Sequence, residues 1–585
     1  MRVLKKKKIP LIVFLLIAGL VFFNYRKTLS FSLAGDDWLA LYRYYIAFPT
    51  RLSYFNLNNY LGNYDASNII VGEISRFFGF NPFPYYFVST IVKILSAISF
   101  IPTIKKLTKN NFAAYLSAIL VAVAFAGVES TNWVFNMSTY FSIALFNLFL
   151  YFYEPFNGKI FNKKIITPAL LMSFSFYLTP IRIHGLLVVL PITIYLLHKL
   201  NSNKKGVNLV SVVAHSVLFL FPSIYFYSVT ATRYGGGYLE NILAIPKLKP
   251  HLFFLPFSYL GAAFIPDKAI MFFKINLSRP DLLSPEKYLT FAGSFLLISL
   301  IITELIKRGI KAPKQFTFLT TTITAVVYLL FGFTLKYDTS GIYHNIIVII
   351  DTLVGIYILV AFTIFFAQKR KANLKVATTG FIYLISTCAV IWIPWIVFPS
   401  GTVHSDTRYL LLPGAYLLVC LSLVLSQFIK KKSFLLFLIV CVFLVANTYS
   451  LNSYFNTLTK VGRPQVDHIR VAKEINSAVP VLDTQASSAY LFTGPDDEYI
   501  YYTIRFGFPY YMLLTHKELN LNFDVSPFPV DNFQSLQQIY NNPNSEELKR
   551  YGYEGQMIAK DHVYSFYIDK YQVTNKTNDI RVMLK

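Results

Sequence analysis

Two adjacent carboxylates, Asp36 and Asp37, stand in the stretch Gly35-Asp36-Asp37-Trp38 of a chain that is otherwise apolar, aromatic and basic. Carboxylates are costly to hold near lipid, so an acidic pair there is a functional-site hypothesis. An ionised but partly desolvated carboxylate can act as a general base, and a neighbouring acid or aromatic ring tunes its basicity. We therefore predict that Asp36 and Asp37 are catalytic, and we favour Asp37 as the base because it adjoins Trp38 and is expected to be the less solvated of the two. The alternative is a helix cap, since aspartate readily accepts backbone N–H groups.

A second acid stands near a tryptophan farther along the chain. Glu129 closes an apolar segment and is followed by Ser130-Thr131-Asn132-Trp133. We expect Glu129 on the same side of the membrane as the acidic pair, which makes it a third candidate catalytic residue. Tryptophan is also enriched at membrane interfaces for its own sake, so the tryptophans alone do not identify a site.

Two arginines are candidates for binding a phosphate. Arg182 and His184 lie in a tight turn between two apolar segments, and Arg408-Tyr409 enters another apolar segment after Asp406. A guanidinium group is always charged and donates paired hydrogen bonds to phosphate oxygens. We predict that these four residues and Trp38 bind substrate. The alternative for Arg182 is an arginine whose charged end reaches the lipid headgroups.

The composition places these residues in a membrane protein. Of 585 residues, 55% are hydrophobic and 14% are charged, too few charges to solvate a globule of this size. Residues 1–450 hold 41 Lys/Arg and 14 Asp/Glu, whereas residues 451–585 hold 13 and 15. The basic excess thus belongs to the apolar part, as the positive-inside rule requires, and it does not indicate nucleic-acid binding. The sequence contains no P-loop, no dinucleotide fingerprint, no zinc-binding helix and no cysteine pattern of a metal site.

Apolar segments of membrane-spanning length predict an all-α polytopic protein with about thirteen transmembrane helices. Every second connection is short and rich in lysine, which places the N-terminus in the cytoplasm and the C-terminal region outside a cell membrane. The predicted spans are 9–24, 85–101, 112–128, 138–153, 165–181, 184–198, 207–230, 289–306, 315–335, 346–366, 377–398, 409–428 and 433–449.

We divide the chain into two domains. Residues 1–450 form the predicted membrane domain, with long outer loops at about 25–84 and 231–288. Residues 451–585 form a small extracytoplasmic α/β domain. In it we predict a helix over 465–478 and strands over 479–483, 489–492, 499–504 and 562–569.

The order of these features resembles the GT-C superfamily. Its members are membrane glycosyltransferases that use polyprenyl-phosphate-linked sugars, such as protein O-mannosyltransferases, aminoarabinose transferases and oligosaccharyltransferase catalytic subunits. The resemblance covers about residues 10–430. It rests on the acidic pair after the first span, a long loop ending in Arg76–Tyr86, the stretch Leu178–Leu197 and the stretch Asp406–Pro413. This chain differs from many relatives in having Asp65-Ala66 in place of Arg-Pro, and Lys93 near the position of a histidine.

The resemblance implies a reaction and roles for the candidate residues. A sugar would move from a polyprenyl-phosphate donor to a glycan, lipid or protein acceptor on the outer face, with inversion. Asp36 or Asp37 would deprotonate the acceptor, Arg182 and Arg408 would hold the leaving phosphate, and Glu129 would orient the sugar or a metal ion. A divalent cation, Mg²⁺ or Mn²⁺, suits carboxylate and water ligands, but the sequence does not decide whether one is needed.

Three alternatives stay open. A polysaccharide polymerase or ligase would depend more on arginine and histidine than on the acidic pair. A transporter or flippase for lipid-linked saccharides would carry ionisable groups at the membrane midplane and show internal repeats, and no repeat is visible in this sequence. A non-catalytic scaffold protein could keep the same fold.

Overall fold

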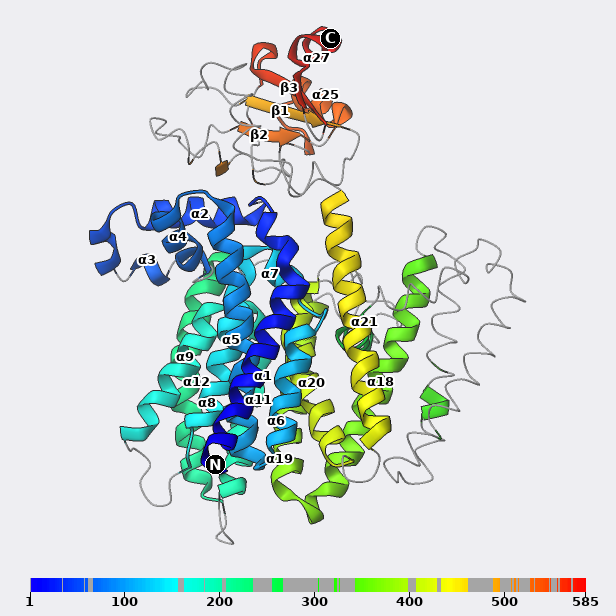
Figure 1. The fold of residues 1–585 in the computed structure, drawn as a ribbon. Helices are drawn as coiled ribbons and strands as arrows, with labels where there is room; N and C mark the ends of the chain where they lie inside the picture. The colour runs from blue at the N-terminus through cyan, green and yellow to red at the C-terminus, as the bar shows by residue number, and fades with distance from the viewer. Residues whose placement is uncertain are drawn as a thin grey trace. The chain divides into compact units, whose positions relative to one another are not determined.

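The computed structural model is mostly helical, with a small sheet near the C-terminus (Figure 1). The described residues are 2–33, 35–56, 58–61, 67–155, 163–183, 185–201, 207–234, 255–266, 304, 320–323, 326, 342–397, 407–428, 433–460, 488–494, 507, 510–511, 514, 527–530, 532–546, 548, 555, 558–569 and 572–584.

The described chain divides into two compact units, which we treat separately. Unit 1 comprises Met1–Tyr25, Thr90–Thr131 and Met137–Ser453, and unit 2 comprises Arg26–Ser89, Asn132–Asn136 and Tyr454–Lys585. The first long loop, which the sequence placed with the membrane domain, is therefore grouped with the C-terminal region.

Unit 1 is built of helices. In chain order they are α1 (Arg2–Tyr25), α5 (Pro82–Thr108), α6 (Asn111–Val123), α7 (Glu129–Asn132), α8 (Ser138–Phe152), α9 (Ile166–Leu178), α10 (Pro180–Ile183), α11 (Gly185–Asn201), α12 (Leu209–Tyr234), α14 (Leu255–Phe264), α18 (Ile342–Ala372), α19 (Leu374–Val397), α20 (Leu411–Ser426) and α21 (Ser433–Lys460), with short 3₁₀ turns at Lys163–Ile165 and Thr407–Leu410. The 3₁₀ turn Val134–Met137 belongs mostly to unit 2. α5, α7 and α21 continue across the boundary into unit 2.

Among the described residues, seven helical stretches are long and apolar enough to cross a membrane. They are Pro10–Ser30, Pro82–Thr108, Val134–Phe152, Asp351–Arg370, Leu374–Trp392, Arg408–Ser426 and Phe437–Thr459. Four shorter apolar helices accompany them. The chain is thus a multi-pass membrane protein, and the predicted number of thirteen spans is not established. The predicted span 289–306 lies almost wholly outside the described residues, and 315–335 lies largely outside them.

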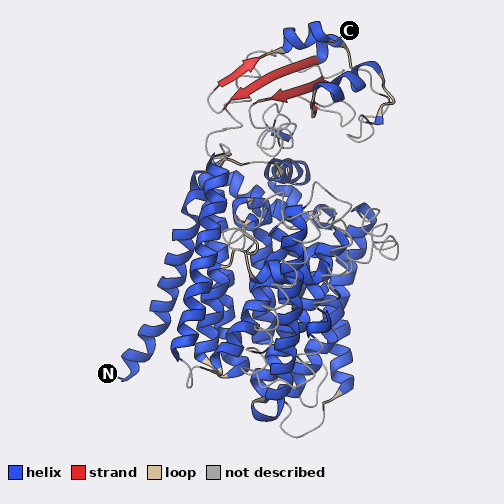
Figure 2. Cartoon of the chain, turned by 90° about the vertical axis from the view of Figure 1, so that its right-hand side faces the viewer, coloured by secondary structure: helices blue, strands red, loops and turns tan. Residues whose placement is uncertain are grey.

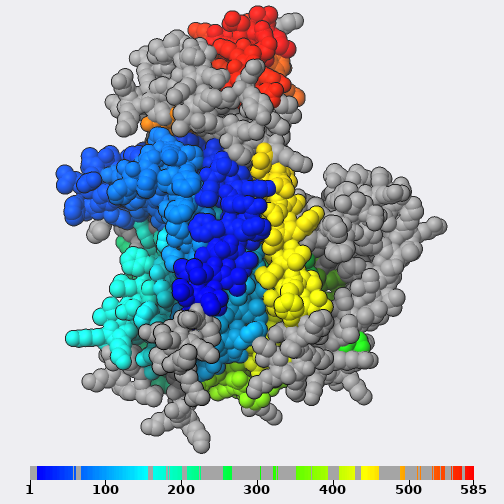
Figure 3. Space-filling model, in the orientation of Figure 1, coloured from blue at the N-terminus to red at the C-terminus, as the bar shows by residue number. Residues whose placement is uncertain are grey.

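The surface of unit 1 is apolar where a soluble protein would be polar. Leu11, Ile12 and Leu15 of α1 and Phe437 and Val445 of α21 are each more than half exposed. Figure 3 shows both helices at the surface, α1 in dark blue and α21 in yellow. An exposed apolar helix face of this length is costly in water and favourable against lipid.

The helices of unit 1 run side by side in both ribbon views (Figures 1 and 2). In Figure 1, α7 lies at the opposite end of these helices from the N-terminus. Close helix packing depends on small residues. A Cβ at Gly261 of α14 would overlap the backbone of Asp351 in α18, and one at Gly355 of α18 would overlap the Phe257 carbonyl of α14. Glycine therefore lets these two backbones cross in contact.

Unit 2 begins with short helices of the first long loop. They are α2 (Asp36–Ala47), α3 (Asn58–Leu61) and α4 (Ser67–Phe78), with 3₁₀ turns at Arg26–Ser30 and Arg51–Phe55. The C-terminal region adds β1 (Ser488–Thr493), β2 (Pro527–Val530), α25 (Phe533–Asn541), a 3₁₀ turn at Lys560–His562, β3 (Val563–Asp569), β4 (Gln572–Asn575) and α27 (Thr577–Met583).

The sheet has the order β2-β1-β3-β4. Strand β1 pairs in parallel with β2 and β3, aligning Leu491 with Val530 and with Ser565, and β4 pairs antiparallel with β3. Buried apolar side chains including Leu491, Val530, Leu536 and Val563 form its core. The predicted strands 489–492 and 562–569 are confirmed. Strands β2 and β4 were not predicted, and the helix 465–478 and the strands 479–483 and 499–504 lie outside the described residues.

Candidate active site

The acidic pair opens helix α2 in unit 2. Gly35 occupies the N-cap position with φ 54°, so Asp36 and Asp37 are the first two helical residues and neither is the N-cap. The positive φ favours glycine there, because a side chain would be strained. Negative charge in the first turn is stabilised by the helix dipole. Asp36 and Asp37 therefore suit the first turn of α2, although neither residue caps the helix.

The two carboxylates have different surroundings. Asp37 is fully buried and its Oδ1 accepts the backbone N–H of Phe135 at 2.9 Å, whereas Asp36 is partly exposed. A hydrogen bond to the ionised form stabilises the charge and reduces basicity. Asp37 thus fastens α2 to the segment after α7, and Asp36 is the more accessible carboxylate.

Trp38 packs in the interior of unit 2. It is 2% exposed, with its ring edge-on to Phe80 at 5.4 Å and to Tyr511 at 4.8 Å between centroids. A Cβ at Gly507 would lie 2.7 Å from the Trp38 ring and 3.0 Å from the Gly35 nitrogen. The C-terminal region therefore contacts the start of α2 directly, through a glycine that leaves room for the indole.

A network of phenols and one carboxylate holds α2 against α4. The Tyr44 hydroxyl lies 2.5 Å from that of Tyr54 and donates to Glu73 at 2.7 Å, and Tyr54 also donates to Glu73. Arg76 lies 5.2 Å from the ring centroids of Tyr44 and Tyr54. Burial, reinforced by these hydrogen bonds, raises the pKa of Tyr44 well above its ordinary value, and burial also raises the pKa of Tyr54. Both phenols therefore stay neutral and keep α2 in place.

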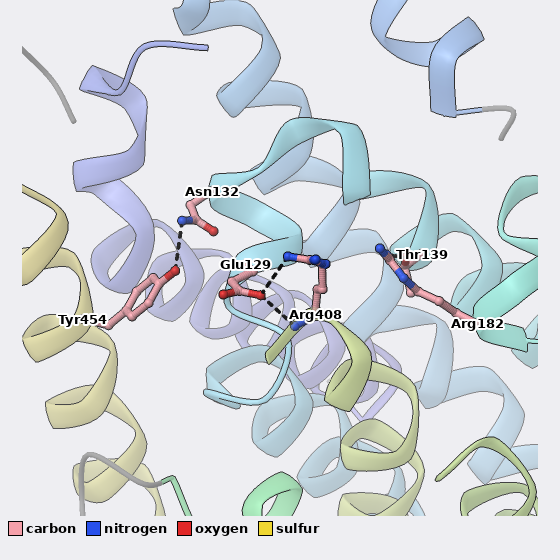
Figure 4. A network of polar contacts seen from close by, with 6 residues as sticks. All are labelled: Glu129, Asn132, Thr139, Arg182, Arg408 and Tyr454. Carbon is pink, nitrogen blue, oxygen red and sulfur yellow. Dashed lines mark hydrogen bonds and ion pairs between the residues drawn. The ribbon is translucent and has the colours of Figure 1, made fainter. Parts of the chain in front are cut away.

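In unit 1, Glu129 and Arg408 form an ion pair (Figure 4). The Arg408 backbone N–H donates to Glu129 Oε2 at 3.2 Å, and its guanidinium Nη1 lies 3.6 Å from the same oxygen. The side chains are 11% and 16% exposed. Two donors on one carboxylate oxygen fix Glu129 against the start of α20.

The turn before Glu129 is shaped to reach α20. Gly127 has φ 82°, and a Cβ on it would collide with Leu411. The Phe125 N–H donates to the Asn447 side chain at 2.8 Å, which ties the same turn to α21. Glycine thus allows both the left-handed backbone and the close approach that bring Glu129 to Arg408.

Arg182 and Arg408 meet on one aromatic ring. Their guanidinium carbons lie 5.3 and 5.2 Å from the centroid of Tyr409, and Arg182 Nη1 donates to Thr139 Oγ1 at 2.7 Å. Figure 4 shows the Arg182 guanidinium beside Thr139. The two arginines are therefore separated by no more than the sum of those two distances. Two guanidinium groups around one ring, one of them paired with Glu129, supply donors of the kind that bind phosphate.

Lys93 is another cation of unit 1, and the sequence named no partner for it. It is 2% exposed, donates to the Tyr140 hydroxyl at 3.3 Å and lies 4.5 Å from the ring centroid of Tyr25. The Tyr140 hydroxyl in turn lies 2.7 Å from Thr131 Oγ1. Two aromatic rings and a hydroxyl thus hold the buried ammonium, and the chain of contacts leads to the helix that carries Glu129.

Sequence reasoning missed several of these groups. Thr139, Tyr140 and the backbone of Phe135 carry no sequence signal, because each acts through a contact with a distant segment. In unit 2, Asn132 donates to the Tyr454 hydroxyl at 3.2 Å (Figure 4). His184, predicted to bind substrate, lies outside the described residues. Within the part of the chain that the structure describes, no three His, Cys, Asp or Glu side chains gather in a way that could hold a metal ion.

No family model and no curated protein matches the sequence. Solved structures with similarity include the archaeal oligosaccharyltransferase AglB from Archaeoglobus fulgidus in complex with an inhibitory peptide and a dolichol-phosphate. That match has a TM-score of 0.41 and 9% identity and covers 96% of this chain and 69% of that one. ArnT from Cupriavidus metallidurans bound to undecaprenyl phosphate matches with a TM-score of 0.28 and 9% identity over 90% and 91% of the two chains.

A second structure of the Archaeoglobus fulgidus oligosaccharyltransferase, tethered to an acceptor peptide, has a TM-score of 0.24 and 12% identity over 68% and 55% of the chains. Oligosaccharyltransferases are among the proteins that the sequence resembles. Because every TM-score lies below 0.5, no residue role or substrate is transferred from these proteins to this chain.

Proposed function

We propose that this chain is a membrane glycosyltransferase that transfers a sugar from a polyprenyl-phosphate donor to an acceptor hydroxyl or amide on the outer face of a cell membrane. The observation that carries the proposal is the pair Arg182 and Arg408 on the Tyr409 ring, beside Glu129. Guanidinium groups held in advance bind a phosphate and stabilise the charge that develops on it as it leaves.

The reaction is a single displacement. The acceptor oxygen or nitrogen attacks the anomeric carbon of the sugar, and the bond from that carbon to the phosphate oxygen breaks. The electron pair of that bond leaves with polyprenyl phosphate, where Arg182 and Arg408 hold the negative charge. One displacement inverts the configuration at the anomeric carbon.

The acceptor's proton passes to a carboxylate of the acidic pair. The partial exposure of Asp36, and the hydrogen bond that Asp37 accepts from Phe135, favour Asp36 as the base and Asp37 as the group that positions α2. A positioned general base contributes about 10²–10⁴ in rate. Glu129 is proposed to hold Arg408 in place and, through its second carboxylate oxygen, to contact the sugar.

The proposed orientation follows the charge pattern. Figure 1 shows α7 and the N-terminus at opposite ends of the unit 1 helices, which supports placing Glu129 on the outer face if Lys5–Lys8 are cytoplasmic. In this orientation the phosphate site opens toward donors in the outer leaflet.

The test is transfer activity in membranes supplied with a panel of radiolabelled polyprenyl-phosphate sugars. Wild type should release free polyprenyl phosphate with at least one donor, whereas Asp36→Asn should lower transfer by about 10²-fold or more. Asp579→Asn, a change to an exposed carboxylate next to Lys576, is the matched control and should stay active. An active Asp36→Asn variant would remove Asp36 from the mechanism.

The same membranes distinguish the transporter alternative. A flippase would move labelled donor between leaflets of proteoliposomes without releasing polyprenyl phosphate. Translocation without sugar transfer across the whole donor panel would therefore contradict the proposed function.

A further inference from the structure

A pocket lies within unit 1, far from the candidate active site. It has a volume of about 950 Å³ and is lined by the last turns of α5 and α8, which contribute Lys105, Lys106, Tyr151 and Phe152. Helix α8 starts shortly after α7, the helix of Glu129, and its 15 residues extend about 22 Å away from it. The pocket therefore belongs to the opposite end of the helices, on the proposed cytoplasmic side.

The charges of this pocket are strongly unequal. Four lysines, Lys105, Lys106, Lys109 and Lys164, line it together with a single acid, Glu154. Lys106 donates to the Tyr151 carbonyl and lies 3.5 Å from Glu154, so the one acid is already shared with that lysine. The remaining lysines give the pocket an excess of positive charge that an anion would neutralise.

Lys109 occupies a backbone position that suits glycine better. Its φ is 59°, and its N–H donates to the Lys105 carbonyl at 3.0 Å, closing the C-terminus of α5. Glycine is the usual residue in such a left-handed cap, because a Cβ is strained there. The lysine at this position places its charge in the pocket wall.

The N-termini of two helices add to the positive charge of the pocket. Asn111 begins α6 and Thr167 is the second residue of α9, and both residues line the pocket. The first backbone N–H groups of a helix carry partial positive charge and attract anions. They reinforce the lysines, which supply most of the charge.

The surroundings of the pocket indicate an amphiphilic anion. Ile166, Leu170 and Phe174 recur every fourth residue along α9 and are 56%, 53% and 55% exposed, and Phe152 in the pocket wall is 47% exposed. These side chains form an apolar stripe that starts beside Thr167. We propose that the pocket binds the phosphate-bearing headgroup of an anionic phospholipid in the cytoplasmic leaflet, with an acyl chain along this stripe of α9.

The test compares lipid binding to the full-length protein by native mass spectrometry in a neutral detergent. Phosphatidylglycerol is the probe, phosphatidylcholine of the same chain lengths is its zwitterionic control with no net charge, and inorganic phosphate is the soluble competitor. The pocket variant is Lys105→Gln with Lys109→Gly, which removes two charges and places glycine where the backbone favours it. The matched control, Arg370→Gln with Lys375→Gln, removes two exposed charges, one near the end of α18 and one at the start of α19.

We expect wild type to bind phosphatidylglycerol in preference to phosphatidylcholine, and the pocket variant to bind it about thirtyfold more weakly, about fivefold for each lysine. The control variant should bind as wild type does. Equal binding by the pocket variant and wild type, or an equal loss in the control variant, would overturn the proposal. Displacement of the lipid by millimolar phosphate would assign the pocket to a soluble phosphate compound and would likewise overturn it.

Discussion

The ring of Tyr409 offers the sharpest test of the phosphate site. Two guanidinium groups lie 5.2 and 5.3 Å from its centroid, and the Arg408 side chain is 16% exposed. A cation over an aromatic ring contributes about 0.5–1 kcal/mol at exposed sites and about 2 kcal/mol when desolvated. We take about 1 kcal/mol for each of these two partly buried contacts. The Tyr409→Leu variant no longer holds the two arginines in place, so its donor binding should be weaker by about 2 kcal/mol, or about thirtyfold in Kd.

The assay is equilibrium binding of polyprenyl phosphate to purified protein, which needs no knowledge of the sugar. Tyr409→Phe keeps the ring face and should bind within about twofold of wild type, whereas Tyr409→Leu keeps an apolar side chain and loses the ring. A Leu variant that binds as tightly as wild type would refute the view that the ring organises the two arginines. A Phe variant as weak as the Leu variant would mean that the hydroxyl, and not the ring, is the group that matters.

Three further predictions follow from the other contacts. The Arg182→Ala variant should bind donor about tenfold or more weakly while the protein stays folded. The Arg182→Lys variant should recover part of the loss, because an ammonium keeps the charge but not the paired hydrogen-bond geometry. Unchanged donor titrations for both variants would leave Arg408 as the phosphate ligand. The pKa of Tyr44 is raised in the folded state, so its neutral phenol stabilises the protein below the ordinary pKa of 10.0, and this stabilisation is lost as the pH rises above that value. The melting temperature should therefore fall less between pH 9 and pH 11 in the Tyr44→Phe variant than in wild type. Equal falls in the two proteins would contradict this prediction. Reporter fusions should report the cytoplasm after Lys109, Lys204 and Lys371 and the outside after Asp36, Asn241 and Gln485, and a cytoplasmic signal from the C-terminal fusion would overturn the proposed orientation.

The class of fold could be predicted from the sequence because the length of an apolar segment is a local property. Segments such as 377–398 and 409–428 are recognisable from composition alone and correspond to α19 and α20. Strands β1 and β3 alternate buried and exposed residues or form an apolar run, so they were predicted as well. Strand β2 contains two prolines in Pro527-Phe528-Pro529-Val530, a composition that argues against a strand and that only pairing with β1 overrides.

Residue types were also sufficient to select Arg182, Arg408 and Glu129 as candidate site residues. They did not predict that these side chains lie close together in space. Arg182 and Arg408 are separated by about half of residues 1–450 and meet at the ring of Tyr409. Gly127 in turn allows the turn before Glu129 to reach Leu411. Lys93 shows the same limit, because its partners Tyr25 and Tyr140 come from two other helices. Contacts of this kind depend on helix packing, which a single sequence does not encode in any local pattern.

The acidic pair shows what adjacency in sequence leaves open about a site. The preference for Asp37 as the base rested on its position next to Trp38 and on an expected low solvation; Asp37 is indeed buried, but neighbouring residues on a helix point about 100° apart and do not face each other. Asp37 turns toward the backbone of Phe135, and Trp38 toward Phe80 and Tyr511. Asp36 points in a third direction and keeps part of its surface exposed. We therefore propose that the helical geometry of α2 divides the work among three consecutive residues: Asp37 anchors the helix, Trp38 packs it, and Asp36 is the carboxylate that an acceptor reaches.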